Sequence, residues 1–205
     1  MQLLLASHNR DKSRELAHAL QGLPIDVRTI DDVGEWPEVE ETGATLEENA
    51  RIKAHAGLHQ FGLPTLADDT GLEVDALHGA PGVYSARFAG PDATYHDNVQ
   101  KMLRELEGVP EAQRTARFRC AIAILDPGGR EAIVHGEVDG RILEAIRGTG
   151  GFGYDPIFVA DGYTHTFGEM DPAVKHTISH RADAFRKLIA DCFVDPRADS
   201  PLPSC

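Results

Sequence analysis

The order of the expected strands and helices constrains the fold of this chain more than any other feature. The first half begins with an apolar strand at residues 3–6 and a helix that places Leu16 and Leu20 on one face. The second half contains a hairpin pattern, in which apolar segments at 116–125 and 131–138 flank an Asp-Pro-Gly-Gly turn. Strand and helix alternation favours parallel pairing, whereas a hairpin is antiparallel, so we predict a mixed sheet in an α/β or α+β layout.

Further patterns complete this expectation. The segment Thr45-Leu46-Glu47-Glu48 has the spacing of a capping box and opens a helix that ends at Gly62. The acidic segment 31–43 has no period and is expected to be a loop, and 142–146 is expected to extend the sheet. The remaining patterns predict strands over 26–30, 65–67 and 157–160 and helices over 95–106 and 179–193.

Length and charge limit the class of protein. A chain of 205 residues is near the size at which one core still grows without splitting, so we expect one bilobed domain over 1–193. The segment 194–205 contains three prolines and no apolar period, and we expect a disordered tail. The formal net charge of −13 opposes nucleic-acid binding. No apolar run approaches the roughly 20 residues of a membrane span. Three cysteines, an odd number, favour a reducing compartment, so we expect a cytoplasmic protein.

A first candidate site is the polar segment Ser7 to Lys12, between the first strand and the first helix. Unpaired backbone N–H groups and the helix dipole favour an anion such as phosphate there. Lys12 falls in the first turn, where a cation is disfavoured unless an anion also arrives. The alternative is that Ser7, Asn9 or Asp11 caps the helix and Lys12 is solvated.

A second candidate site is made of carboxylates, and Mg²⁺ prefers such hard oxygen ligands. Asp68 and Asp69 come where the strand 65–67 is expected to end, and adjacent strand residues face opposite sides. Glu40 and Glu41 lie in the acidic loop. The alternative is an ordinary solvated acidic loop.

Two later segments also have functional and structural interpretations. The glycine-rich run 148–156 precedes a strand rather than opening a helix, so it does not fit a dinucleotide-binding loop. Its Phe152 and Tyr154 are stacking candidates, or else they fill the core. Lys175 and the pair His180-Arg181 at the start of the last helix are anion or acceptor contacts, or else ordinary surface charge.

Taken in order, these segments resemble the inosine/xanthosine triphosphate pyrophosphatase family over about residues 1–193. The matching pieces are Ala6-Ser7-His8-Asn9 through Lys12 and Glu15, Glu40-Glu41-Thr42-Gly43, Glu48-Asn49-Ala50 with Lys53-Ala54, Ala67-Asp68-Asp69-Thr70-Gly71-Leu72, Gly79-Ala80-Pro81-Gly82 with Tyr84-Ser85-Ala86-Arg87, Gly150 to Pro156, and Ser179-His180-Arg181. One departure is His8, where many members have glycine.

The resemblance implies an α/β fold with an elongated mixed sheet, flanked by helices, and two lobes around a nucleotide-binding cleft. It implies a homodimeric, Mg²⁺-dependent hydrolase that releases pyrophosphate from ITP, dITP or XTP. The implied catalytic base is Asp69, and the implied metal ligands are Glu40 and Asp69. The implied substrate contacts are Ser7, His8, Asn9, Arg10, Asp11, Lys12, Lys53, Thr70, Phe152, Gly153, Tyr154, Asp155, Lys175, His180 and Arg181.

The expected chemistry follows from these roles. Asp69 deprotonates a water while Lys12 and Lys53 screen the leaving pyrophosphate. Arg181 only donates hydrogen bonds, so it favours the O6 acceptor of hypoxanthine or xanthine over the amino group of adenine. Two other functions stay open: a Maf-like nucleotide pyrophosphatase of different base specificity, and a nucleotide sensor that binds without turnover.

Overall fold

The computed structural model describes residues 1–192, which form two compact units. Unit 1 comprises residues 1–69, 120–136 and 181–192, and unit 2 comprises residues 70–119 and 137–180. The boundaries between these ranges fall within three strands and at the start of the last helix. The predicted tail at 194–205 lies outside the described residues.

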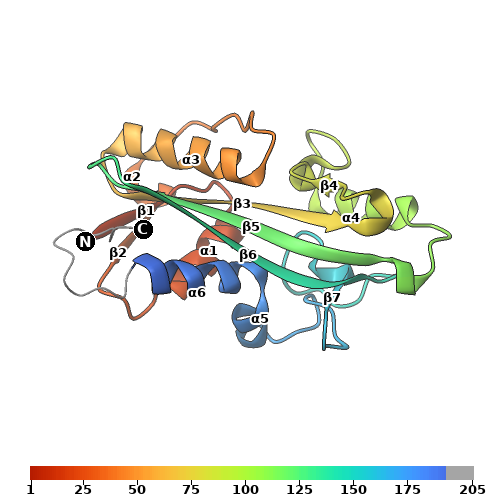
Figure 1. Ribbon diagram of the computed structural model, residues 1–205. Helices are drawn as coiled ribbons and strands as arrows, with labels where there is room; N and C mark the ends of the chain where they lie inside the picture. The colour runs from red at the N-terminus through yellow and green to blue at the C-terminus, as the bar shows by residue number, and fades with distance from the viewer. Residues whose placement is uncertain (193–205) are drawn as a thin grey trace. The chain divides into compact units, whose positions relative to one another are not determined.

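The seven strands form one mixed sheet, as the sequence predicts (Figure 1). Their order is β2-β1-β3-β5-β6-β7, and β4 pairs with β3. β1 is parallel to both β2 and β3, whereas β4 and β7 are antiparallel to their partners β3 and β6. The strands are β1 (Gln2–Leu5), β2 (Asp26–Thr29), β3 (Thr65–Val74), β4 (Pro81–Gly82), β5 (Thr115–Leu125), β6 (Glu131–Ile142) and β7 (Phe158–Ala160).

Helices cover both faces of the strands of unit 1 (Figure 1). α1 (Arg10–Ala19) and α6 (His180–Cys192) pack on the face that carries Leu3 and Leu5, and α3 (Leu46–Phe61) lies on the opposite face. At Gly57 of α3, an added Cβ would lie 2.8 Å from Thr65 Cγ2, so only glycine lets the helix approach the sheet this closely. Unit 1 also contains the single turn α2 (Ile30–Val33).

Unit 2 has its own apolar core. Leu72 of β3 and Phe118 of β5 pack with Phe158 of β7 and with Met102 of α4 (Tyr95–Glu105). Its other helical segments are α5 (Pro172–Ile178) and the 3₁₀ turns η1 (Asp75–Leu77), η2 (Ser85–Arg87), η3 (Glu111–Gln113) and η4 (Asp155–Ile157).

The caps explain where the site-bearing helices begin. The Asn9 side chain accepts hydrogen bonds from the backbone N–H groups of Asp11 and Lys12, so Asn9 is the N-cap of α1. The Thr45 side chain accepts from the N–H of Glu48 at the start of α3, and Gly62 ends that helix in the left-handed conformation. The predicted start and end of α3 are therefore confirmed.

Four expectations about elements are corrected. Residues 65–74 form one strand, so Asp68 and Asp69 lie within β3 rather than at its end. The segment 143–146 forms no strand, because β6 already ends at Ile142. α5 precedes α6 and was not expected, and α2 interrupts the expected loop 31–43.

Within residues 1–192, every helix is too short or too polar to cross a lipid bilayer.

Candidate active site

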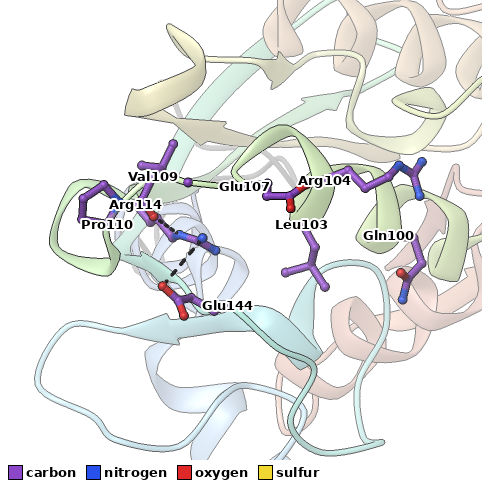
Figure 2. A pocket seen from close by; sticks show the side chains of 9 residues that line it. Gln100, Leu103, Arg104, Glu107, Val109, Pro110, Arg114 and Glu144 are labelled. Carbon is purple, nitrogen blue, oxygen red and sulfur yellow. Dashed lines mark hydrogen bonds and ion pairs between the residues drawn. The ribbon is translucent and has the colours of Figure 1, made fainter.

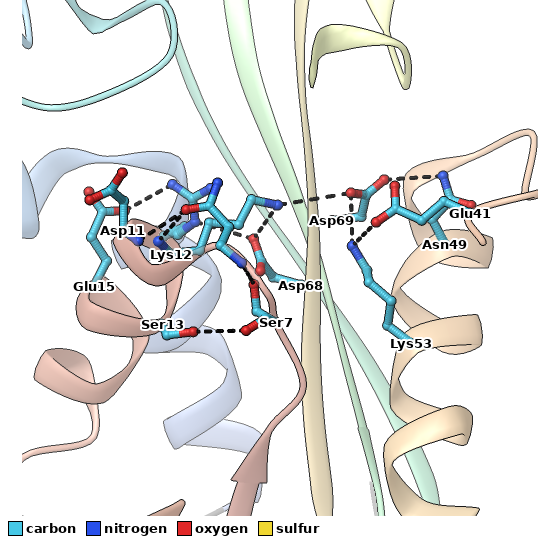
Figure 3. Close-up of polar contacts among 12 residues, drawn as sticks. Ser7, Asp11, Lys12, Ser13, Glu15, Glu41, Asn49, Lys53, Asp68 and Asp69 are labelled. Atoms are coloured by element: carbon cyan, nitrogen blue, oxygen red, sulfur yellow. Dashed lines mark hydrogen bonds and ion pairs between the residues drawn. The ribbon is translucent and has the colours of Figure 1, made fainter. Parts of the chain in front are cut away.

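Adjacent carboxylates in β3 belong to one charged cluster of unit 1 but point to opposite faces of the strand. Asp68 lies toward α1, where its Oδ2 is 3.2 Å from Lys12 Nζ and 3.2 Å from Arg181 Nε (Figure 3). Asp69 lies toward α3, where its Oδ1 is 3.1 Å from Lys53 Nζ. The twofold alternation of a strand explains this division, since successive side chains point to opposite faces.

Lys12 is drawn inward by the aspartates. Its ammonium group lies 3.2 Å from Asp68 and 3.9 Å from Asp69, and only 15% of its side chain is exposed. The alternative interpretation of this segment was a helix cap with a solvated Lys12. Asn9 does cap α1, but Lys12 is not solvated, so that part of the alternative is wrong. The carboxylates compensate for the unfavourable position of a cation in the first turn of a helix.

Arg181 anchors Asp68 from α6. Its guanidinium also donates to Glu15 Oε2 at 2.9 Å, and its side chain is 4% exposed. Burial by itself raises the pKa of Asp68, but Lys12, Arg181 and Lys53 outweigh burial and hold that pKa well below its usual range. Asp68 is therefore a buried anion fixed between cations.

Lys53 links Asp69 to the acidic loop. Its Nζ lies 2.8 Å from Glu41 Oε1 as well as 3.1 Å from Asp69 Oδ1, and Asn49 donates to Asp69 Oδ2 at 3.3 Å. Burial lowers the pKa of Lys53, but the carboxylates of Asp69, Asp68 and Glu41 raise it overall. Lys53 is therefore a fully charged ammonium group beside the candidate base.

The remaining residues of the first loop lie around this cluster or on the surface. Ser7 is buried, and its Oγ accepts from the N–H of Asn9. Arg10 is exposed and pairs with Asp31 at 3.3 Å. His8 is also exposed, and Asp11 is half-buried in the first turn of α1.

A second cluster lies within unit 2. Asp155 Oδ2 accepts from Lys175 Nζ at 2.6 Å and from the backbone N–H of Phe152 at 2.8 Å. Lys175 lies 4.8 Å from the centre of the Phe152 ring, a cation–π contact, and Tyr95 covers the same ring at 5.9 Å. Because Lys175 is 4% exposed, the surface-charge interpretation of this lysine is wrong.

The two aromatic residues of the glycine-rich loop differ. Tyr154 is buried and donates to the carbonyl of Ser85 at 2.9 Å, and burial raises the pKa of its hydroxyl. It therefore fills the core, whereas Phe152 is half-buried. His180 is also buried and stacks on Phe118 at 4.8 Å, so it is not surface charge. Gly153 is half-buried and has a φ of 62°.

Predicted site residues thus form two groups. Lys12, Lys53, Asp69 and Arg181 meet in unit 1, and the Asp155 cluster is in unit 2. Thr70, the first residue of unit 2, follows Asp69 in β3 and is half-buried.

Unit 2 also has an open hollow of about 470 Å³ between the end of α4 and the start of β5 (Figure 2). It contains no predicted site residue. The Arg114 guanidinium at its wall donates to the carbonyl oxygens of Leu106, Val109 and Leu143, which explains its burial structurally.

Comparison with known proteins identifies the family. A model of the Ham1 family matches residues 3–191. The chain belongs to the Ham1 family. A dITP/XTP pyrophosphatase of Geobacter sulfurreducens is 49% identical over 186 residues, which cover 91% of this chain and 94% of the relative. The corresponding enzyme of Bacillus subtilis is 46% identical over 90% of this chain and 93% of its own length.

A solved structure shows the same Ham1 fold. The HAM1 protein of Coxiella burnetii is 42% identical, has a TM-score of 0.83, and covers 93% of this chain and 97% of its own. The family resemblance and the α/β mixed sheet predicted from the sequence are confirmed. The two-lobed cleft and the roles of individual residues stay predictions.

The acidic residues of unit 1 offer the oxygen ligands that Mg²⁺ prefers. Within residues 1–192, no three histidine, cysteine, aspartate or glutamate side chains are grouped closely enough to hold a metal by themselves. Mg²⁺ usually takes only one or two carboxylates and completes its shell with water and substrate phosphates. Asp69 is a carboxylate of this kind, and its ligand role stays a prediction. Glu40 is exposed, and its neighbour Glu41 approaches Asp69 through Lys53.

Sequence reasoning missed several contributors in this Ham1 protein. Glu15 and Asn49 belong to the matching segments, but the sequence pattern predicts no role for them, and in the structure they bind Arg181 and Asp69. The helical period supplied a signal for Glu15, which lies one turn beyond Lys12. Tyr95 had no signal, because its contact with Phe152 joins residues 57 positions apart.

Proposed function

We propose that this protein hydrolyses non-canonical purine nucleoside triphosphates, namely ITP, dITP and XTP, to the nucleoside monophosphate and pyrophosphate. The main support is membership of the Ham1 family together with relatives, 45–50% identical, that are named dITP/XTP pyrophosphatases. The cluster around Asp68 and Asp69 supplies groups suited to this chemistry. Such an enzyme removes damaged nucleotides from the precursor pool.

The charges of the cluster favour a metal-chelated substrate. Lys12, Lys53 and Arg181 face four carboxylates, those of Glu15, Glu41, Asp68 and Asp69. The cluster is therefore negative by one charge, and a bare polyanion would be repelled. We infer that the enzyme depends on Mg²⁺, held by Asp69 and Glu40, which when bound neutralises phosphate charge and polarises the phosphoryl group.

In the proposed reaction, Asp69 orients a water molecule and accepts its proton as the water attacks the α phosphorus. Lys12 and Lys53 bind the β and γ phosphates, so their charge stabilises the pyrophosphate as it leaves. Asp68 stays ionised and holds Lys12 in place. Arg181 positions Asp68.

The resemblance also assigns residues of unit 2 to the nucleotide, among them Phe152, Asp155 and Lys175. The Phe152 ring beside the buried ammonium group of Lys175 is suited to stacking on a purine. That ammonium group donates to a keto oxygen but not to the amino group of adenine.

We further propose a cytoplasmic homodimer. The mass in solution, measured by light scattering, tests the dimer.

The deciding experiment measures pyrophosphate release from ITP, XTP, GTP and ATP, each with and without Mg²⁺. We expect Mg²⁺-dependent turnover of ITP and XTP, with ATP slower by several orders of magnitude, because a hydrogen-bonding site discriminates by about 10⁴. Asp69→Asn keeps the shape and removes the base, so we expect a loss of about 10²-fold or more in kcat.

The same experiment separates the rival functions. Preference for pyrimidine or canonical nucleotides would indicate a Maf-like enzyme. Tight ITP binding with Mg²⁺ but no product would indicate a sensor. Turnover by Asp69→Asn near that of the unaltered protein would exclude Asp69 as the base.

A further inference from the structure

An aromatic pair joins two loops of unit 1. His8 belongs to the segment Ser7 to Lys12. Trp36 belongs to the loop between α2 and α3, residues 34–45, which contains most of the acidic segment 31–43 and is the acidic loop in the structure. The two rings are stacked, with centroids 5.0 Å apart and planes inclined by 22°. His8 Nε2 lies 2.9 Å from the carbonyl oxygen of Trp36. Because a carbonyl oxygen only accepts, Nε2 carries the proton and donates it.

The acidic loop is held at both of its ends. Near its start, Trp36 contacts the ring of Phe61, the last residue of α3, edge-on at 6.3 Å. Near its end, Glu41 pairs with Lys53, and the backbone N–H of Gly43 donates to Asn49 Oδ1 at 2.8 Å. The short stretch between these attachments carries Glu40.

The contact with His8 is more specific than ordinary surface packing. It combines stacking with a directional hydrogen bond to the backbone of the acidic loop. Pro37 follows Trp36 and restricts that residue to extended conformations, so little backbone freedom is lost when the contact forms. Glycine at position 8 would provide neither interaction.

We propose that the His8–Trp36 pair positions the acidic loop against the phosphate-binding segment, so that binding of phosphate at the start of α1 and placement of Glu40 and Glu41 are coupled. His8 and Trp36 are positioning residues, and they act through the carboxylates. The inference rests on the proposed function only in taking Ser7 to Lys12 as the place where phosphate binds.

Trp36 is the only tryptophan in the sequence, so tryptophan fluorescence reports on the surroundings of this one residue, and the His8 variants show which part of the signal depends on the pair. We would titrate the protein with inorganic tripolyphosphate, with and without Mg²⁺, and follow the emission. We expect a saturable change in the unaltered protein. In His8→Ala the change is largely lost, and affinity falls by about three- to tenfold, the size of one aromatic contact.

Matched variants separate the stacking from the hydrogen bond. His8→Phe keeps the ring and loses the donor, so we expect an intermediate response. His59→Ala removes an exposed histidine from α3 and should respond like the unaltered protein.

Steady-state kinetics provides a second measurement. Trp36→Ala should raise KM for ITP by the same three- to tenfold with a smaller effect on kcat, and in Trp36→Phe the KM should return most of the way to that of the unaltered protein.

The outcomes distinguish this inference from the proposed function. If tripolyphosphate leaves the emission unchanged, or if His8→Ala responds like the unaltered protein, the coupling does not exist. If the emission responds through His8 while ITP is not hydrolysed, the proposed function fails and the coupling stands. Equal KM values for Trp36→Ala and Trp36→Phe would also overturn the proposal. Circular dichroism checks that each variant is folded.

Discussion

At the scale of single residues, two neighbouring aspartates have different surroundings because a strand directs them to opposite faces. Asp68 is completely buried and is fixed by Lys12 and Arg181. Asp69 is 5% exposed and contacts Lys53 and Asn49. Both carboxylates have cationic partners, so exposure is the difference between them: a carboxylate that is closed to solvent is suited to structural support, and its slightly exposed neighbour is the better candidate for proton transfer to or from a water molecule.

Arg181 provides the sharpest test at this scale. Because Arg181→Ala leaves the buried carboxylate of Asp68 and the half-buried carboxylate of Glu15 without their guanidinium partner, we expect it to lower the free energy of unfolding by about 3–5 kcal/mol. Urea unfolding at pH 7 measures this loss. Arg186→Ala on the same helix removes an exposed arginine that pairs with Asp183, and it should cost less than about 1 kcal/mol.

The same variant tests the second role of Arg181. If Arg181 also contacts the purine base of the substrate, Arg181→Ala lowers the ratio of ITP turnover to ATP turnover. This ratio is measured under conditions in which the variant is still folded. A stable variant with unchanged selectivity would show that neither role is correct.

At the scale of elements, the glycine-rich loop depends on close contact between its backbone and Asp155. Gly151 has a φ of 68°, and an added Cβ would lie 2.0 Å from Asp155 Oδ2. That same oxygen accepts from Lys175 and from the N–H of Phe152. A side chain at position 151 therefore disturbs the whole cluster.

We expect Gly151→Ala to lower the free energy of unfolding by more than Gly162→Ala. Gly162 has a φ of 82° with nothing within 4 Å of an added Cβ, so its substitution adds only the left-handed strain of about 1–2 kcal/mol. Gly151→Ala adds the displacement of Asp155 and should also raise KM for ITP. Urea unfolding and steady-state kinetics measure both effects, and equal losses in the two variants would contradict this account of the loop.

Elements with strong local signals were predictable from the sequence, and those set by tertiary contacts were not. The cap at Thr45 and the glycine at 62 placed α3 within a residue. The continuity of β3 was missed because the polar run Asp68 to Thr70 looks like the end of a strand, whereas in the structure lysines and Arg181 neutralise its carboxylates. The sequence pattern of β3 does not show which distant lysines and arginine neutralise its aspartates.

The candidate site was predictable to a similar extent. A lysine in the first turn of α1 indicated a missing anion, and the structure supplies Asp68 for it. The identity of that partner, 56 positions away, required the fold. The burial of Lys175 likewise depends on Asp155, which a loop far along the chain presents.

At the scale of the whole molecule, buried charges make stability depend on pH. The pKa of Asp68 is lower in the folded protein than the value near 3.9 expected in the unfolded chain. The folded state thus binds fewer protons in acid, and this contribution to stability is present above about pH 4 and is lost as the pH falls through the folded-state pKa. Lys53 behaves in the opposite sense. Its pKa is raised in the folded protein, so its contribution is present below about pH 10.5 and is lost at higher pH.

We therefore expect the free energy of unfolding to fall between about pH 4 and 3, with a slope of up to about 1.4 kcal/mol per pH unit from Asp68. Urea unfolding at several pH values measures this slope. Asp68→Asn is less stable at pH 7, because Lys12 and Arg181 lose a buried anionic partner, but its slope in acid should be smaller by up to that amount. Carboxylates elsewhere in the protein titrate in the same range and contribute equally to both proteins, so the difference between the two slopes reports on Asp68 and on Asp69 and Glu15, which share its cations. Identical slopes would mean that folding does not lower the pKa of Asp68, and its role as the anchor of Lys12 would then be wrong.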